Sequence, residues 1–284
     1  MKVFNKICEC RSIISNNRRM DVTERLIQSI ERAADVLELF LITKPELSIK
    51  EISEKLNLSK STVHGIIKTL EHRGYLQQNP EDSKYKLGIK LFELGNFMGK
   101  NLDIGRIAKP IIRELVDELN ETVHLVMLQR DELIYIEKVE GPSTLTIYSH
   151  IGKRAPFHCT SVGKAILAYL HENEVDRILS SLDLESFTDY TITNIDDIKN
   201  HLESIREKGY AMDDEEIELG LKCVGAPIFN HQGNVIASIS CAAPKMRLDE
   251  KRLPKVIAGI KKAASEISNC LGYKGDHYQI ESTT

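Results

Sequence analysis

Residues 48–76 read SIKEISEKLNLSKSTVHGIIKTLEHRGYL and contain two short amphipathic segments with almost no linker between them. Ser48, followed three residues later by Glu51, is a capping box and predicts the start of one helix. Ser59 predicts the N-cap of a second helix, whose apolar residues recur at helical spacing on one face, and Gly74 predicts its end. The stretch therefore predicts a helix-turn-helix.

The second helix carries no acidic residue on the face opposite its apolar stripe. That face is made of Ser61, His64, Gly65, Lys68 and His72. A helix that needed only solvation would mix in glutamates, as the first helix does with Glu51 and Glu54. Short hydrogen-bond donors and a cation instead suit base edges and phosphates in a major groove, so we expect DNA binding. The competing interpretation is a helical hairpin that merely packs.

The flanking segments complete a winged helix-turn-helix. Residues 24–42 have a helical apolar pattern that Pro45 ends, and residues 75–87 read as strand, turn and strand. Such a hairpin lies over the DNA backbone beside the groove, which would place Lys84 and Lys86 on phosphates. Six basic residues against three acidic ones between positions 57 and 90 agree with this interpretation. The predicted DNA-binding residues are Ser59, Lys60, Ser61, Thr62, His64, Gly65, Lys68, Lys84 and Lys86.

Composition excludes several classes of protein. The chain has 284 residues, enough for two domains of ordinary size, and it is 42% hydrophobic and 28% charged, as a globular protein should be. No run approaches the roughly 18 apolar residues of a membrane helix. The basic N-terminus also lacks the apolar core of a signal peptide. Six cysteines without paired spacing fit a reducing compartment, so we expect a cytoplasmic protein.

The second half predicts a mixed α+β domain. Helical patterns fill most of residues 88–120, and further helices are predicted at 162–170, 172–181, 196–208 and 248–271. Strands are predicted at 122–128, 133–139, 144–149, 210–214, 223–229 and 235–242. Strands and helices do not alternate strictly, which indicates α+β rather than a doubly wound sheet. Neither a Walker loop nor a Rossmann glycine fingerprint is present, which disfavours nucleotide hydrolysis and dinucleotide binding.

Several ordered motifs resemble the IclR family of bacterial transcription regulators. In the first half they are IQSIERAADVLELF, the stretch quoted above and YKLGIKLFELG; in the second they are GKRAPFHCTSVGKAILAYL, GYAMDDEEIELGLKCVGAPIFN and GNVIASISCAAP. Together they cover about residues 25–272. The resemblance implies two domains of α+β class: a winged helix-turn-helix at 21–88 and, after a linker helix at 89–102, a GAF-like effector-binding domain with an antiparallel sheet at 103–273. Residues 274–284 form a tail, and residues 1–20 are either a disordered basic tail or an over-long translation start, since family members begin near Met20.

The resemblance also implies a function. It implies a regulator, expected to be a repressor, that binds double-stranded DNA at a palindromic operator, as a homodimer or a dimer of dimers, with an affinity controlled by a small acidic metabolite. The sequence itself does not decide between repression and activation. We expect no enzymatic activity, cofactor, metal or membrane partner. One departure concerns Gly65, where the family commonly has arginine. Glycine weakens the helix and removes a possible guanine contact, so the operator preference does not carry over.

The resemblance places effector contacts at Ile147, Ala155, Asp213, Leu221, Cys223, Ser240 and Ala242. Family members often have a second serine in place of Ala242, so the identity of the ligand does not follow. From the residues themselves, Ser161 predicts the cap of the next helix, whose first-turn N–H groups would bind an anion. Strand alternation in residues 210–214 puts Ala211 and Asp213 on one face, where Asp213 would accept a hydroxyl hydrogen bond. We therefore expect a hydroxy- or oxo-acid.

Three alternatives remain at this stage. A cytosolic Cys-His hydrolase would use Cys159 or Cys223 as nucleophile and His158 as base, although no nucleophile signature surrounds them. The same side chains with Asp213 would make a zinc-binding sensor, but metal-ligand spacing is missing. In both cases the winged helix would be an appended interaction domain. The third alternative is a pure interaction module that uses its winged helix to bind protein, and salt-sensitive binding to duplex DNA distinguishes that possibility.

Overall fold

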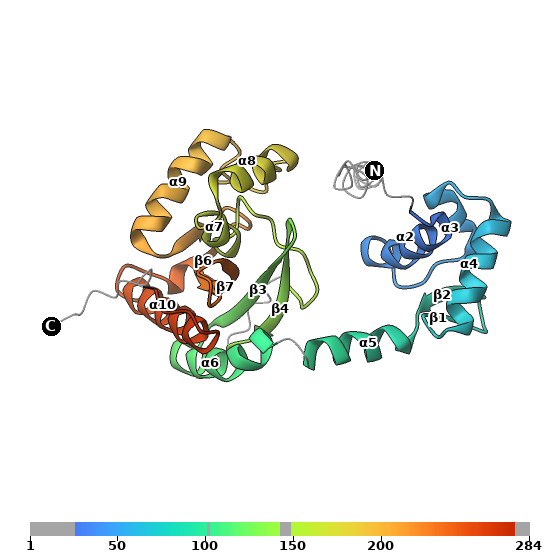
Figure 1. Cartoon of the computed structure of the whole chain (residues 1–284), viewed down its shortest axis with the longest axis horizontal. Coiled ribbons are helices and arrows are strands. Elements are labelled where there is room, and N and C mark those ends of the chain that lie inside the picture. The colour runs from blue at the N-terminus through green and yellow to red at the C-terminus, as the bar shows by residue number, and fades with distance from the viewer. Residues whose placement is uncertain (1–25, 101–102, 143–148, 276–284) are drawn as a thin grey trace. The chain divides into compact units, whose positions relative to one another are not determined.

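The chain divides into two compact units, residues 1–101 and 102–284. The computed structural model describes residues 26–100, 103–142 and 149–275 (Figure 1). Of the helices in these ranges, none combines the length and the apolar composition that crossing a bilayer requires.

The N-terminal unit is a winged helix-turn-helix followed by one further helix. Its elements are α2 (Gln28–Ile42), α3 (Ile49–Leu56), α4 (Lys60–His72), β1 (Leu76–Gln78), β2 (Tyr85–Leu87) and α5 (Ile89–Lys100). The first three helices and the hairpin enclose a small apolar core in which Ile52, Val63 and Ile67 are fully buried. Tyr85 joins the hairpin to this core, and its backbone exchanges hydrogen bonds with Leu47 in the connection between α2 and α3.

The sequence features that predicted the ends of these helices form the expected hydrogen bonds and backbone turns. The Ser48 hydroxyl accepts from the Glu51 N–H at 3.3 Å, and the Glu51 carboxylate accepts from the Ser48 N–H at 2.8 Å, which is the predicted capping box. Asn57 turns the chain between α3 and α4 with a φ of 53°. Gly74, with a φ of 76°, follows the end of α4 in the position where left-handed backbone favours glycine.

The C-terminal unit is built on one antiparallel sheet of five strands. Its elements in chain order are α6 (Asp103–Leu119), β3 (Thr122–Gln129), β4 (Glu132–Val139), α7 (Ser161–Leu167), α8 (Glu172–Ser181), α9 (Ile195–Lys208), β5 (Ala211–Asp214), β6 (Leu221–Phe229), β7 (Val235–Pro244), the 3₁₀ turn η2 (Lys245–Arg247) and α10 (Leu253–Cys270). The strand order across the sheet is β4-β3-β7-β6-β5. The two-unit α+β architecture expected from the sequence is confirmed.

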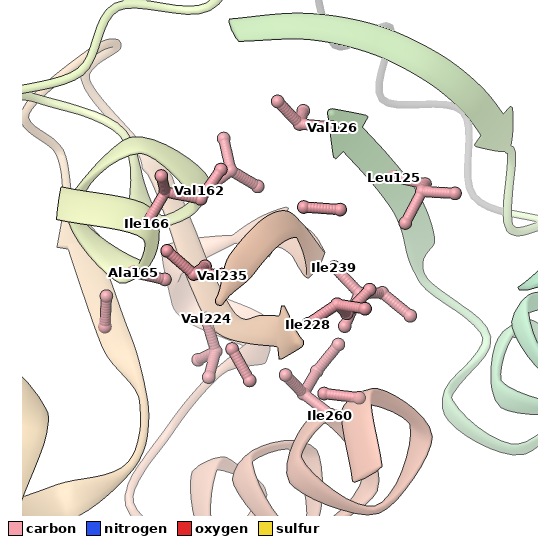
Figure 2. Close-up of a cluster of buried hydrophobic side chains, with 14 of the residues drawn as sticks. Leu125, Val126, Val162, Ala165, Ile166, Val224, Ile228, Val235, Ile239 and Ile260 are labelled. Atoms are coloured by element: carbon pink, nitrogen blue, oxygen red, sulfur yellow. The ribbon is translucent and has the colours of Figure 1, made fainter. Parts of the chain in front are cut away.

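Helices pack on both faces of this sheet. α10 and α6 pack on one face and on each other, whereas α7 packs on the other. Figure 2 shows Val224 pointing toward the side of Ile260 in α10, while Val126 lies on the side of Val162 in α7. Because successive strand residues point to opposite faces, Cys223 lies on the α7 face. This face holds most of the predicted effector contacts.

Most predicted elements are present, but several ends differ. The first helix begins at Gln28 rather than at residue 24, and α7 ends at Leu167 rather than at residue 170. The last helix begins at Leu253, because η2 and a turn occupy the residues before it. The predicted strand at 144–149 falls almost entirely outside the described residues.

Candidate functional site

The polar face of α4 begins at its cap. The Ser59 hydroxyl accepts from the Thr62 N–H at 3.2 Å and lies 2.9 Å from the Ser61 hydroxyl. Ser61, His64 and Lys68 are exposed, whereas the apolar stripe of the same helix is buried. Hydroxyl, imidazole and ammonium groups on one exposed helix face can donate to base edges and to phosphates.

Gly65 and Lys68 on this face have surroundings that the sequence did not predict. A Cβ built on Gly65 would meet no atom within 4 Å, so packing does not require glycine there. The Lys68 amine lies 2.9 Å from the Glu71 carboxylate, which the sequence interpretation had not counted as part of the face. A DNA phosphate would have to replace Glu71 as the partner of Lys68. Exposed pairs of this kind are worth little, so the exchange costs little.

The two lysines of the β1–β2 hairpin are not equivalent. The Lys84 amine lies 2.5 Å from the Asp82 carboxylate, which also accepts from the Lys84 N–H at 3.1 Å. Lys86, on β2, is exposed. Lys86 is therefore better placed than Lys84 to meet a phosphate.

In the C-terminal unit, predicted effector contacts meet on the α7 face of the sheet. Asp213 on β5 is in register with Cys223 on β6, and Cys223 is in register with Ala242 on β7. Ser240 lies on the same face two residues before Ala242, and all four residues are buried. Leu221 packs with Cys223 and Ala242 in a small apolar cluster separate from the main core. The face thus combines an apolar patch with hydrogen-bonding groups.

The remaining predicted contacts lie around this patch or outside the described residues. Ala155 is buried beside β4, where its N–H donates to the Leu133 carbonyl at 2.9 Å. Ser161, at the start of α7, lies against β6 because Gly225 has no side chain: a Cβ there would lie 2.9 Å from the Ser161 carbonyl group. Ile147 falls in the segment that the structure does not describe.

The prediction that Ser161 caps α7 is wrong. Thr160 is the N-cap: its hydroxyl accepts from the Gly163 N–H at 3.0 Å and donates to the Pro156 carbonyl at 2.6 Å. Ser161 is instead the first residue of the helix and is buried. Its hydroxyl is therefore not needed to cap the helix, and its Cβ lies beside Gly225 of β6.

Asp213 is a buried carboxylate with an unsatisfied oxygen. Its side chain is 1% exposed, and Oδ1 accepts from the Glu216 N–H at 2.8 Å. Oδ2 has no hydrogen-bond partner in the part of the chain that the structure describes. Burial raises the pKa of Asp213 to about 7, and the hydrogen bond from Glu216 opposes that rise. An unpaired carboxylate oxygen in this position is costly, and a ligand donor would satisfy it.

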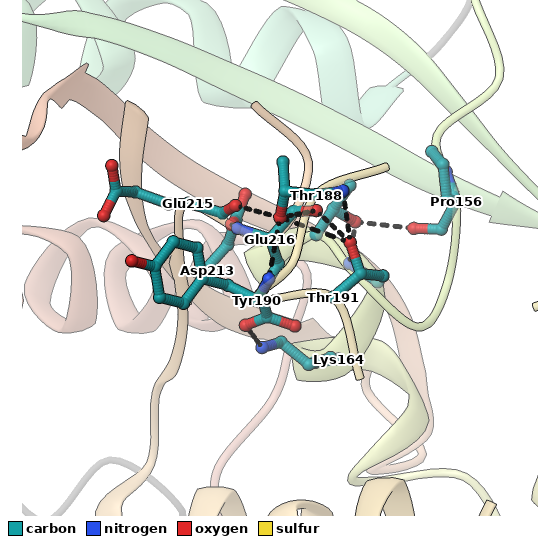
Figure 3. A network of polar contacts seen from close by, with 10 residues as sticks. Pro156, Lys164, Thr188, Tyr190, Thr191, Asp213, Glu215 and Glu216 are labelled. Carbon is teal, nitrogen blue, oxygen red and sulfur yellow. Dashed lines mark hydrogen bonds and ion pairs between the residues drawn. The ribbon is translucent and has the colours of Figure 1, made fainter. Parts of the chain in front are cut away.

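A buried ion pair fixes the turn that carries Asp213. The Lys164 amine, fully buried on α7, contacts the Glu216 carboxylate, as Figure 3 shows. The Thr188 and Thr191 hydroxyls donate to the backbone carbonyls of Glu215 and Glu216 respectively, each at 2.6 Å. Burial raises the pKa of Glu216, and Lys164 opposes the rise. The turn after β5 is thus tied both to α7 and to the loop that contains Thr188.

The sequence interpretation missed this pair. Lys164 stands in a helix, where a lysine is ordinarily solvated, and Glu216 stands in an acidic run 52 residues away. One signal was present: Lys164 follows the apolar and small residues of a helix that has no polar face. A helix buried on all sides must pair its only cation.

Tyr135 and His124 also lie on the α7 face and were also missed. His124 on β3 is in register with Ser240 on β7 and with Lys138 on β4. The pairing of β3 with β4 shifts by one residue after this point, so that Val126 faces Tyr135. The shift is a β-bulge, which re-aims the following side chains. The Tyr135 and His124 rings meet edge to face with centroids 5.3 Å apart.

His124 is buried and Tyr135 is half-buried, and both side chains are neutral. Burial lowers the pKa of His124 to about 3, and its Nε2 lies 2.7 Å from the Ser149 hydroxyl. Burial also raises the pKa of the Tyr135 hydroxyl, with further contributions from Cys223 and Asp213. Asp213, on the β5 edge strand, and Cys223, on β6, thus affect the pKa of Tyr135 although Tyr135 is on the β4 edge strand.

The geometry does not support a thiol-dependent hydrolase. Burial raises the pKa of both Cys159 and Cys223, whereas an activated nucleophile needs a lowered pKa. The Nε2 of His158 lies 3.0 Å from the Glu185 carbonyl. Among the described residues, no group of three or more His, Cys, Asp or Glu side chains is arranged to hold a metal ion.

Two surface cavities lie away from the buried cluster. One of about 390 Å³ is lined by residues of α8, α9 and the turn before α8, including Val175, Leu202 and Arg206. Another of about 370 Å³ lies along the start of α2, beside Ile27 and Ile30. Neither cavity contains a predicted site residue.

A winged helix-turn-helix with a polar outer face, followed by an α+β unit with a buried polar cluster, defines a two-domain DNA-binding transcription regulator. The chain belongs to the IclR family of such proteins. Residues 29–80 match the IclR helix-turn-helix domain, and residues 97–269 match the C-terminal domain of bacterial IclR transcriptional regulators.

Individual relatives align with this chain over nearly their whole length. The HTH-type transcriptional regulator XynR of Escherichia coli K12 is 41% identical over 248 residues, which are 87% of this chain and 98% of XynR. The transcriptional repressor IclR of the same organism is 30% identical over 248 residues, 87% of this chain and 90% of that protein. The crystal structure of Thermotoga maritima IclR matches with a TM-score of 0.71 and 35% identity, covering 86% of this chain and 99% of that one. These relatives are transcription regulators, and the chain is a DNA-binding regulator rather than an enzyme.

Proposed function

We propose that this regulator is a repressor whose affinity for a palindromic operator is controlled by a small organic acid bound on the α7 face of the sheet. The observation that carries the effector proposal is the buried Oδ2 of Asp213 on the α7 face, which has no hydrogen-bond partner among the described residues; Oδ1 of Asp214 and Oε2 of Glu216 in the same turn also lack one. Buried polar oxygens in folded proteins usually have a hydrogen-bond partner, and the hydroxyl of a ligand would supply one to Asp213.

The chemistry of the cluster favours one orientation of the ligand. A hydroxyl or hydrated carbonyl would donate to Asp213, and the carboxylate would accept from N–H groups in the first turn of α7, only one of which is taken by Thr160. Ser240 would contribute a further hydrogen bond, and the apolar cluster around Cys223 would contact the carbon chain. This arrangement fits the hydroxy- or oxo-acid expected from the sequence.

On the DNA side, the exposed residues of α4 would enter the major groove and Lys86 would contact a phosphate. Ser61, His64 and Lys68 are the side chains proposed to face the bases, with Lys84 as a second phosphate contact once it leaves Asp82. Repression is proposed because the E. coli relative named above is a repressor. The effector releases the operator if operator and effector favour different arrangements of the protein.

A palindromic operator requires two copies of the chain. Several large apolar side chains on α2 and α5 are exposed, among them Ile30 at 64%, Phe92 at 68% and Phe97 at 72%. Surfaces of this kind usually mark an interface, so we assign α2 and α5 to the contact between copies in a homodimer or a dimer of dimers.

The test is a thermal-shift screen of small organic acids, repeated with operator DNA selected from a random-sequence pool. An effector should raise the melting temperature of the free protein and release the DNA. Asp213→Asn should lose the effector response and keep operator binding, because the amide still accepts from the Glu216 N–H but no longer offers a carboxylate. Asp214→Asn is the matched control, since the neighbouring carboxylate points to the opposite face and pairs with Lys222 and Lys245. A full effector response in Asp213→Asn would refute the proposed site.

A further inference from the structure

Tyr135 reaches the α7 face only because of the β-bulge. Without the shift after Leu125, Ile136 would face Val126 and Tyr135 would turn to the face covered by α6. The strand thus inserts one residue to bring a long, polar-tipped side chain toward the candidate site. Bulges that re-aim side chains are concentrated next to functional sites.

Several contacts hold Tyr135 in this position. Its N–H donates to the Lys153 carbonyl at 3.0 Å, and its own carbonyl accepts from the Gly152 N–H at 2.8 Å. On the other side its ring packs edge to face on His124, which is fixed by Ser149. The same flanking segment continues to Ala155, one of the predicted effector contacts. The backbone of Tyr135 is therefore held by hydrogen bonds and its ring by His124, as a preorganised binding residue requires.

The site has two polar ends on opposite edge strands of the sheet. Asp213, with its unsatisfied oxygen, is on the β5 edge strand, and Tyr135 is on the β4 edge strand. Between them on the α7 face, β6 and β7 carry the small residues Cys223, Gly225 and Ser240, whereas β3 carries His124 and Val126 beside Tyr135. Adjacent strands are about 4.8 Å apart, so the two edge strands are separated by roughly 19 Å at the backbone. A long side chain such as tyrosine shortens this separation from the β4 side, and Asp213 and Cys223 both contribute to the raised pKa of the Tyr135 hydroxyl.

We propose that the Tyr135 hydroxyl contacts the effector directly and selects acids that carry a second hydrogen-bonding group, a hydroxyl or a carbonyl, at the end of the molecule away from Asp213. The inference rests on the proposed function and adds a specificity residue to it. A two-carbon acid bound at Asp213 and the start of α7 would leave Tyr135 without a ligand partner. A hydroxylated acid of about three to six carbons would engage both ends.

The test uses pairs of acids that differ by hydroxyl groups remote from the carboxylate: lactate and glycerate, 2-hydroxybutyrate and 2,4-dihydroxybutyrate, and 2-hydroxyhexanoate and gluconate. Their dissociation constants are measured by calorimetric titration of the full chain. In the wild-type protein, in at least one pair, the acid with the additional hydroxyl groups should bind more tightly than the acid without them. Tyr135→Phe, which keeps the ring and its contact with His124, should weaken that member about three- to thirtyfold and leave its partner unchanged.

Tyr169→Phe is the matched control. The Tyr169 ring packs on Phe229, with centroids 5.1 Å apart, and its hydroxyl donates to the Arg206 carbonyl at 3.4 Å, away from the α7 face groups named above. It should leave every dissociation constant unchanged. Equal effects of Tyr135→Phe on both members of each pair, or no effect, would overturn the inference.

The same panel separates this inference from the proposed function. If Asp213→Asn abolishes binding while Tyr135→Phe does not discriminate within pairs, the inference is wrong and the proposed function stands. If the wild-type protein binds no member of the panel, the effector class inferred here is wrong, whereas the proposed function is decided by the broader acid screen.

Discussion

Replacing Lys164 with methionine should strongly destabilise the C-terminal unit. Lys164 is fully buried and its amine contacts Glu216, which is 5% exposed. Methionine keeps the length and the apolar stem but removes the charge, leaving Glu216 buried without its cation. Removing one partner of a buried pair typically costs about 3–5 kcal/mol. For a unit of this size that corresponds to a fall in melting temperature of roughly 6–20 °C.

The loss should depend on pH. Burial already raises the pKa of Glu216, and without Lys164 the pKa should rise further. An acid whose folded-state pKa lies above its unfolded value binds more protons when folded, so stability falls as the pH rises through the interval between the two values. The destabilisation of Lys164→Met should therefore be smaller near pH 5 than near pH 8.

Differential scanning calorimetry at the two pH values measures both effects. Lys199→Met is the control, because its pair with Asp176 is exposed on both sides and should be worth less than about 1 kcal/mol. The double change Lys164→Met with Glu216→Leu should recover much of the stability, since it removes both buried charges. A melting temperature for Lys164→Met that matches the control at both pH values would refute the reasoning.

Four further predictions concern the two units. Gly65→Ala should stabilise the N-terminal unit by about 0.5–1 kcal/mol in thermal unfolding, because the Cβ enters open space; destabilisation would contradict this. Lys86→Ala should weaken binding to all duplexes alike and reduce the slope of log affinity against log salt concentration by about one, whereas His64→Ala should change the preferred DNA sequence. If His64→Ala and the wild-type protein select the same sequences in a binding-site selection, His64 does not contact the bases. For Asp213, whose folded pKa of about 7 exceeds its ordinary value, wild-type stability should fall between pH 4 and 7, and Asp213→Asn should lack that slope. Phe92→Glu should shift sedimentation toward monomer at micromolar concentration; a wild-type monomer would exclude the proposed interface.

The N-terminal unit could be predicted closely because its signals are local. The capping box at Ser48 and Glu51, the cap at Ser59 and the left-handed glycine at Gly74 each act within a few residues of chain. Such contacts form in the same way whatever the rest of the protein does. The inward face of Asp213 was predicted for the same reason, because alternation along a regular strand is a local rule, and the register with Cys223 confirms it.

The parts that could not be predicted depend on distant partners or on irregular backbone. Thr160 and Ser161 are equally plausible caps in sequence, and the Pro156 carbonyl that engages Thr160 is visible only in the folded loop. The partner of Lys164 lies 52 residues away. Tyr135 would be assigned to the opposite face by simple alternation, because a bulge shifts every later residue by one. The polar residues of the candidate site were therefore found only in part.

The burial of the candidate site also determines how fast the regulator can respond. Ala155, Ser161, Asp213, Cys223 and Ser240 are all buried, so an effector can reach them only after the protein opens locally. We expect association to be limited by the opening rate and to saturate as effector concentration rises in stopped-flow measurements, rather than to increase linearly. Dissociation requires the same local opening, so the opening rate should also limit how fast a bound effector leaves and should lengthen its residence time. Under the proposed function, such a regulator would average fluctuations in metabolite level that are shorter than the residence time of the effector.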